Sequence, residues 1–185
     1  MSRGLRSWAV LVLSLLAVPV LAKDIEGTPI ADQITAEGKT VRLIGGGIRT
    51  KWMFSVYVGA LYAEKPTFNA VNLIKSEQVK RMELHMLRDV GKDKIVESIT
   101  EGFEKQSRDQ MPALKDRLAQ LAAAVPDLKK GDVLTLTYVP DKGTVVGGAG
   151  KETVIPGKDF ADALFTVWLG PDPVDGDLKR KLLGG

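Results

Sequence analysis

The chain has 185 residues, of which 44% are hydrophobic and 26% are charged, and its formal net charge is +3. This balance excludes an intrinsically disordered chain and predicts one globular domain with a substantial core. The sequence contains one histidine and no cysteine, which excludes disulfides and a Cys/His metal cluster, so we predict no metal site.

The N-terminus has the pattern of a secretory signal peptide. Arg3 and Arg6 form a basic start, an apolar run begins at Trp8, and Val20-Leu21-Ala22 matches the small residues that a signal peptidase reads. The alternative is an N-terminal membrane anchor. The run is short for a membrane span and the charged Lys23-Asp24 follows at once, so we favour cleavage after Ala22.

The mature protein is therefore expected to be a single domain over residues 23–185, with no transmembrane segment. An exported chain without cysteines fits a bacterial periplasm best. Removal of residues 1–22 takes away two arginines and lowers the net charge from +3 to +1. Such a small charge argues against the basic surface of a nucleic-acid-binding domain.

The first half of the mature chain is predicted to be mostly strand. Residues 40–44 form a short strand, and residues 51–62 form a long one whose nearly continuous apolar residues require cover on both faces. A short helix is expected over residues 68–74. Residues 79–88 alternate in polarity, as in a half-buried strand, with Met82, Leu84 and Met86 on one face and Arg81, Glu83 and His85 on the other.

Two amphipathic helices are expected next, over residues 92–106 and 109–124. In both segments the apolar residues recur at steps of three and four, and in the first of them Ile95, Ile99 and Phe103 form the stripe.

The last part of the chain returns to strands before it ends in helices. Strands are predicted over residues 132–139, 144–146 and 152–155, followed by a helix from Asp159 and an amphipathic segment over residues 176–183. This order predicts an α+β fold with helices gathered on one side of a largely antiparallel sheet.

The stretch IGGGIRTKW, residues 44–52, raises the first question about function. It lacks the Gly-Lys-Ser/Thr ending of a phosphate loop and precedes a strand instead of a helix, so we predict no nucleotide and no other cofactor. The glycines instead predict a turn or a bulge. On an extended strand one face would carry Arg49, Lys51, Met53, Ser55 and Tyr57.

Arg49 is the residue of most interest, because a guanidinium at the end of a buried strand needs a negative partner. From residue types alone, the simplest interpretations are that Arg49 reaches water or pairs with a nearby Asp or Glu. The only histidine, His85, lies on the polar face of its strand and has no nucleophile-elbow motif nearby, which argues against a serine hydrolase.

Four segments follow one another along the mature chain: GGGIRTKWMFSVYVGALYAEKP, DKIVESITEGFEK, KGDVLTLTYVPDKGTVV and KDFADALFTVWLGPDPVDGDLKRKLLG. In sequence, order and spacing they resemble the chalcone isomerase family, and in particular its exported bacterial chalcone isomerase-like branch. The resemblance covers residues 34–183. It implies an open-faced β-sandwich, in which a large antiparallel sheet packs against a helical layer with a ligand cleft between them.

The resemblance also implies roles for single residues. The family arginine that matches Arg49 faces the cleft; it assists cyclisation of a chalcone in the plant enzyme and holds a carboxylate in plant fatty-acid-binding relatives. The enzyme's threonine on the long strand falls at Tyr57, its tyrosine near Gly91, its asparagine at Ser98 and its second threonine at Val167. These departures favour binding over isomerase activity.

Three functional hypotheses follow. The first is a periplasmic, non-catalytic binder of a small amphiphilic or carboxylate ligand such as a fatty acid, held by Arg49, Tyr57 and Ser98. The groove would be lined by Met53, Ser55, Ile95 and Ile99. The second is an intramolecular lyase of the chalcone–flavanone isomerase type, with Arg49 as the one candidate catalytic residue that stabilises an oxyanion. The third is a structural or partner-binding protein without a ligand.

Overall fold

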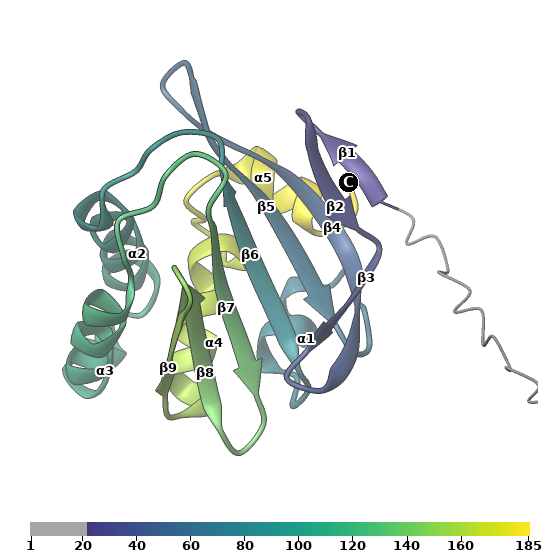
Figure 1. Cartoon of the computed structure of the whole chain (residues 1–185). Helices are drawn as coiled ribbons and strands as arrows, with labels where there is room; N and C mark the ends of the chain where they lie inside the picture. Colours follow the sequence, from purple (N-terminus) through teal and green to yellow (C-terminus); the bar gives the residue numbers. More distant parts are fainter. Residues whose placement is uncertain (1–21) are drawn as a thin grey trace, which may run out of the picture.

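A seven-stranded antiparallel sheet forms the centre of the computed structural model, which describes residues 22–185 (Figure 1). The strand order β3-β4-β5-β6-β7-β8-β9 follows the chain, so each strand pairs with the next one. Its strands are β3 (Gln33–Ala36), β4 (Lys39–Lys51), β5 (Phe54–Ala63), β6 (Lys80–Met86), β7 (Val133–Val139), β8 (Gly143–Gly148) and β9 (Lys151–Ile155). A separate hairpin precedes the sheet and consists of β1 (Ala22–Ile25) and β2 (Thr28–Ala31).

Five α-helices and one short 3₁₀ helix complete the described part of the chain. They are α1 (Ala70–Lys75), α2 (Lys92–Gln106), η1 (Arg108–Gln110), α3 (Met111–Ala124), α4 (Lys158–Leu169) and α5 (Gly176–Leu182). Among residues 22–185 no helix has both the length and the apolar character that crossing a membrane requires. The predicted signal peptide lies outside the described residues, apart from Ala22.

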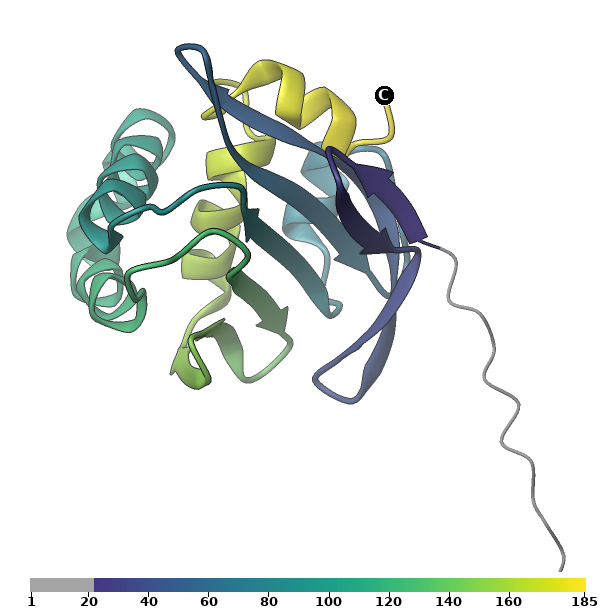
Figure 2. The same cartoon turned by 45° about the horizontal axis from the view of Figure 1, so that its top comes forward.

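The sheet curls into a half-barrel whose concave side holds the helices (Figures 1 and 2). Helix α4 lies against the inner face between α1 and α2, and α5 covers β4 and β5. The main core lies between sheet and helices, and a second apolar cluster lies on the outer face beneath the β1–β2 hairpin. This arrangement confirms the predicted α+β fold, a large antiparallel sheet packed against a helical layer.

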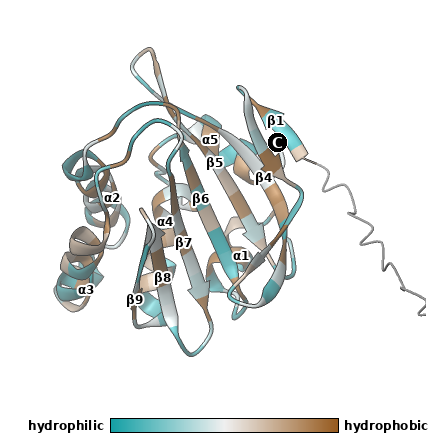
Figure 3. Ribbon diagram, viewed as in Figure 1, coloured by the Kyte–Doolittle hydropathy of each residue, from teal (hydrophilic) through white to brown (hydrophobic). Residues whose placement is uncertain are grey.

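The hydrophobic patterns explain the elements nearest the concave face. Met82, Leu84 and Met86 of β6 are buried there, while the residues between them are partly exposed, which confirms the predicted alternation. The apolar stripe of α2, which includes Ile95 and Ile99, is also buried. In Figure 3 hydrophobic residues recur along the central strands, and hydrophobic and hydrophilic residues are mixed on α2 and α3.

The three glycines begin beside a bulge and do not form a turn, so the predicted bulge is confirmed and the predicted turn is wrong. The β4–β5 register skips Ile44 between Leu43 and Gly45. Gly45, Gly46 and Gly47 lie inside the thirteen-residue strand β4, and none of them has a positive φ. A Cβ on Gly45 would overlap the carbonyl oxygen of Lys181, and one on Gly47 would lie 2.7 Å from the Cβ of Lys181. The glycines therefore allow α5 to pack directly on the strand.

The turn lies seven residues further on than the sequence suggested. Trp52 and Met53 join β4 to β5, so the predicted strand over residues 51–62 is really the end of one strand, a tight turn and the next strand. The turn holds Trp52 at a φ of 62°, which a bulky side chain seldom adopts. No glycine, asparagine or proline marks it in the sequence, which explains why it was not predicted.

Candidate functional site

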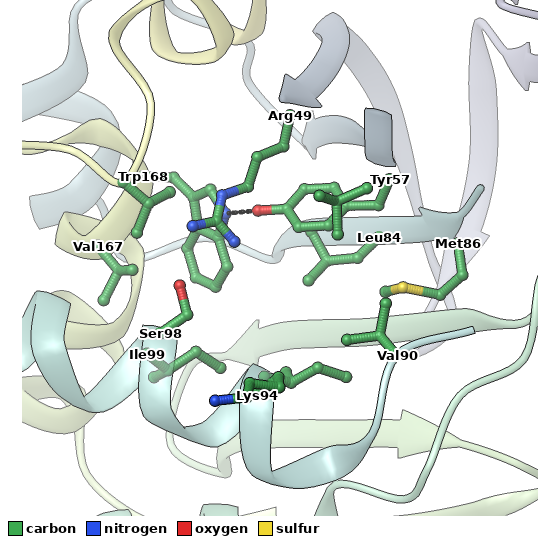
Figure 4. Close-up of a pocket in the computed structure, with 13 residues that line it drawn as sticks. Arg49, Tyr57, Leu84, Met86, Val90, Lys94, Ser98, Ile99, Val167 and Trp168 are labelled. Atoms are coloured by element: carbon green, nitrogen blue, oxygen red, sulfur yellow. Dashed lines mark hydrogen bonds between the residues drawn. The ribbon is translucent and has the colours of Figure 1, made fainter. Parts of the chain in front are cut away.

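A narrow cavity lies between the concave face of the sheet and helices α2 and α4. Thirteen residues line it, nine of them apolar, and the polar ones are Arg49, Tyr57, Lys94 and Ser98 (Figure 4). Its volume is about 30 Å³, which is room for about two water molecules. A ligand larger than two water molecules would therefore require the lining side chains to move.

Arg49 and Tyr57 face each other across the β4–β5 pair at the head of this cavity. They are direct partners in the strand register, and the guanidinium carbon of Arg49 lies 5.8 Å from the centre of the Tyr57 ring. Beside this pair the register skips one residue, since Thr50 pairs with Ser55 and leaves Val56 as a bulge. Because of the bulge, both Val56 and Tyr57 reach the cavity.

The Arg49 side chain has a buried donor that no group in the described part of the chain satisfies. Its Nε is shielded from solvent and has no hydrogen-bond partner. Within residues 22–185, no carboxylate lies within 4.0 Å of the guanidinium. Asp175, which approaches from α5, accepts hydrogen bonds from the backbone N–H groups of Thr50 and Leu178, at 3.2 and 2.9 Å. The positive charge is therefore open to a ligand.

Tyr57 supplies a neutral hydroxyl next to this charge. The indole Nε1–H of Trp168 donates a hydrogen bond to the Tyr57 hydroxyl oxygen at 2.8 Å, drawn as the dashed line in Figure 4. Burial raises the pKa of Tyr57, and the neighbouring positive charge of Arg49 only partly opposes this effect. The phenol thus remains protonated, and its own O–H is free to donate to a ligand oxygen beside the guanidinium.

Two further hollows at the surface share Arg49 with the cavity. One is a groove of about 400 Å³ beneath the β4–β5 turn, lined by four basic residues, the two aromatic residues Trp52 and Phe54, and the carboxylate Asp89. The four basic residues are Arg49, Lys51, Arg88 and Lys94. The other, of about 80 Å³, lies between α2 and the segment that leads into α5. Arg49 lines all three spaces, so it lies where they meet.

The structure brings together three of the five residues predicted for the site. Arg49, Tyr57 and Ser98 line the cavity, as do Ile95 and Ile99 of α2. Whether they bind a ligand remains a prediction.

Met53 and Ser55 do not line the cavity, which corrects the sequence-based site. Met53 lies in the turn and is 90% exposed. The hydroxyl of Ser55 donates to Glu26 at 3.4 Å, next to the β1–β2 hairpin. The turn and the bulge at Val56 break the simple alternation that had placed these residues beside Arg49.

Sequence reasoning missed two hydrogen-bond donors at the cavity, the indole of Trp168 and the ammonium of Lys94. Trp168 lies in the predicted helix that begins at Asp159, and its indole positions the Tyr57 hydroxyl. Lys94 lines the rim, although its ammonium also pairs with Glu97 at 2.8 Å. An indole on a buried helix face needs a hydrogen-bond acceptor, and this need was the available signal.

The remaining candidate, His85, lies away from the cavity on the outer face of β6. Its Nε2 lies 3.0 Å from an oxygen of Glu83, two residues earlier on the same strand. Within residues 22–185, no three metal-binding side chains gather into a possible site.

Comparisons with known proteins agree with this geometry. The model of the family described as chalcone isomerase-like matches residues 22–184. A solved structure, described as a fatty-acid binding protein of Arabidopsis thaliana, superposes with a TM-score of 0.70 at 14% sequence identity, over 89% of this chain and 96% of that one. No curated protein has a matching sequence. At this level of identity the structural likeness establishes the fold alone.

Proposed function

The chain belongs to the chalcone isomerase-like family, and we propose that it is a non-catalytic binder of a small amphiphilic carboxylate such as a fatty acid. The observation that carries the proposal is the guanidinium of Arg49, which has a buried, unpaired Nε at the head of an apolar cavity. A similar fold in a protein described as a fatty-acid binding protein supports the same class of ligand.

The chemistry of the cavity suits a carboxylate head group. A guanidinium binds a carboxylate through two parallel hydrogen bonds, and such charge-assisted pairs are roughly twice as strong as neutral hydrogen bonds. The protonated Tyr57 hydroxyl adds a neutral donor beside Arg49, and Ser98 adds another across the cavity (Figure 4). The apolar lining then favours an alkyl or aromatic tail.

The residues around the head group favour binding over catalysis. The family's catalytic tyrosine falls near Gly91, which begins α2 without a side chain, and its second threonine falls at Val167, which is buried and apolar. Arg49 and Tyr57 can hold an anion, and the other polar side chains at the cavity are the hydroxyl of Ser98 and Lys94, which pairs with Glu97 at 2.8 Å. A lyase acting on an unsaturated phenolic ketone is the competing hypothesis.

The site is further proposed to operate in the periplasm, as the predicted signal peptide over residues 1–22 suggests. Fractionation of the native cells tests this proposal, because a cytoplasmic protein that still carries residues 1–22 would contradict it.

The ligand class is tested with the protein that begins at Lys23. Binding of a saturated fatty acid is compared by calorimetry with binding of its methyl ester, which has the same tail and no negative charge. We expect the acid to bind at least tenfold more tightly, since a charge-assisted hydrogen bond contributes about 1.5–3 kcal/mol. Equal affinities would contradict a carboxylate site, and turnover of a chalcone that disappears in Arg49→Gln would favour the lyase.

A further inference from the structure

The turn between β4 and β5 carries three consecutive large apolar side chains into solvent. Trp52 and Met53 are each 90% exposed and Phe54 is 57% exposed. Figures 1 and 2 show this turn projecting beyond the rest of the domain, on the side opposite α1. Residues 52–54 are called the hairpin tip below. Exposed apolar groups at such a projection need an explanation, because folding alone gains nothing from them.

The backbone of the hairpin tip strengthens this argument. Trp52 has a φ of 62°, a conformation in which a bulky residue costs of order 1–3 kcal/mol. Glycine or asparagine would adopt it with little strain. A tryptophan at this position therefore costs stability and makes no buried contact in return, which indicates a role outside folding.

Positive charge surrounds the hairpin tip. Lys51, Arg88 and Lys94 line the groove beneath it, and the guanidinium of Arg88 lies 4.9 Å from the ring centre of Phe54. The one carboxylate in this groove, Asp89, already accepts hydrogen bonds from the Lys130 backbone at 2.9 Å and from the Lys129 ammonium at 3.3 Å. Glu97 pairs with Lys94 at 2.8 Å and offsets its charge, while Lys51 and Arg88 have no carboxylate within 4.0 Å in the described part of the chain. The cations at the tip therefore outnumber the acids near them.

We propose that the hairpin tip docks on an anionic lipid bilayer, with residues 52–54 in the interfacial layer and Lys51 and Arg88 against the lipid phosphates. Tryptophan is favoured at the membrane interface, and each lysine or arginine near an anionic surface adds about 1 kcal/mol of attraction. Three side chains on a narrow turn form a wedge, whereas a stable protein interface buries about 800 Å² on each partner. The lipid surface is therefore the better fit for this tip.

This inference goes beyond the proposed function, because it concerns different residues and a different partner. It also assigns a role to the groove in the entry of a ligand. The groove beneath the tip leads to Arg49, so docking would turn the mouth of the cavity toward the bilayer. An amphiphile leaving the bilayer would meet the cations of the groove first and Arg49 last.

The test uses the protein that begins at Lys23, because the apolar run in residues 1–22 would bind membranes by itself. Co-sedimentation is measured with vesicles of phosphatidylethanolamine and phosphatidylglycerol, and with vesicles of phosphatidylcholine alone. We expect binding to the anionic vesicles, weakened by salt, and little binding to the neutral ones. Trp52→Ala combined with Met53→Ala should reduce binding about tenfold or more, and Lys51→Gln should reduce it about fivefold.

Tryptophan fluorescence locates the contact. The protein from Lys23 onward has two tryptophans, Trp52, which is exposed, and Trp168, which is 3% exposed, so a blue shift and quenching by brominated lipid report on Trp52. The matched control combines Phe68→Ala with Val71→Ala, which removes two exposed apolar side chains from the opposite end and should leave vesicle binding unchanged.

Three results would overturn the proposal: no binding to anionic vesicles, equal loss in the control variant, or full binding by the Trp52/Met53 variant. If the protein does not bind anionic vesicles, the hairpin tip would instead be interpreted as a surface for a protein partner. Fatty-acid affinity of the same variants, measured without vesicles, keeps this outcome separate from failure of the proposed binding site.

Discussion

Replacing Arg49 with glutamine tests the central electrostatic argument. Glutamine keeps an amide donor and much of the side-chain length but removes the charge. A guanidinium and a carboxylate about 4 Å apart attract each other by about 4 kcal/mol at an effective dielectric constant of 20. Removing one partner of a buried, hydrogen-bonded charge pair costs about 2–5 kcal/mol, so fatty-acid affinity should fall about 30-fold or more.

The methyl ester of the same fatty acid makes the measurement specific. Its affinity should change less than about threefold in Arg49→Gln, because the ester has no charge for the guanidinium to attract. Arg42→Gln is the matched control, since Arg42 is an exposed arginine on the same strand, and it should bind the acid like the unmodified protein. Isothermal titration calorimetry measures all six combinations of the three proteins and the two ligands.

Stability separates a ligand-binding role of Arg49 from a structural one. With its Nε unpaired and no carboxylate near it within residues 22–185, Arg49 contributes little to folding in the absence of ligand. The free energy of unfolding of Arg49→Gln, measured with urea, should therefore match or exceed that of the unmodified protein. A loss of more than about 2 kcal/mol, or equal loss of affinity for acid and ester, would refute the reasoning.

Three further predictions concern the fold around the site. Lys80 is fully buried, and burial lowers its pKa from 10.5 to about 8. At a pH between these two values the lysine is protonated in the unfolded chain and largely neutral in the folded one, so the unfolded chain binds more protons. The free energy of unfolding should therefore rise by about 2 kcal/mol between about pH 7 and pH 9.5, and this rise should vanish in Lys80→Met. Gly45→Ala should lower the free energy of unfolding by about 1–3 kcal/mol, because the added methyl group would push α5 off the strand. Gly176→Ala is the control and should leave the free energy of unfolding unchanged, because its methyl group would meet no neighbour. Trp168→Phe and Tyr57→Phe should each lower the free energy of unfolding, measured with denaturant. The loss in the double variant should be about 1 kcal/mol smaller than the sum of the two single losses, because either change alone already removes the shared hydrogen bond.

Elements with a clear period could be predicted from the sequence. Strand β6 has a strict alternation, and α2 has apolar residues at steps of three and four, so both follow from residue types alone. Residues 22–36 were not predicted to form strands at all. Their three short strands have no long apolar pattern, and they are stabilised by pairing and by packing on the outer face of the sheet.

The site was predicted less completely than the fold, because its geometry depends on two irregular positions. A period of two residues places Met53 and Ser55 beside Arg49, but the Trp52–Met53 turn and the bulge at Val56 reverse that placement. Neither feature has a sequence signal of the usual kind, since glycine, asparagine and proline are absent from both.

The same irregularities explain why Arg49 is available to a ligand. The bulge turns Tyr57 inward, where Trp168 holds its hydroxyl, so the phenol stacks against Arg49 without neutralising it. The glycines before Arg49 let α5 approach closely, and Asp175 at the start of α5 is then occupied by backbone N–H groups. Asp175 thereby helps to hold α5 on the sheet. No carboxylate within residues 22–185 comes within 4.0 Å of the guanidinium, which leaves its positive charge for a molecule from outside.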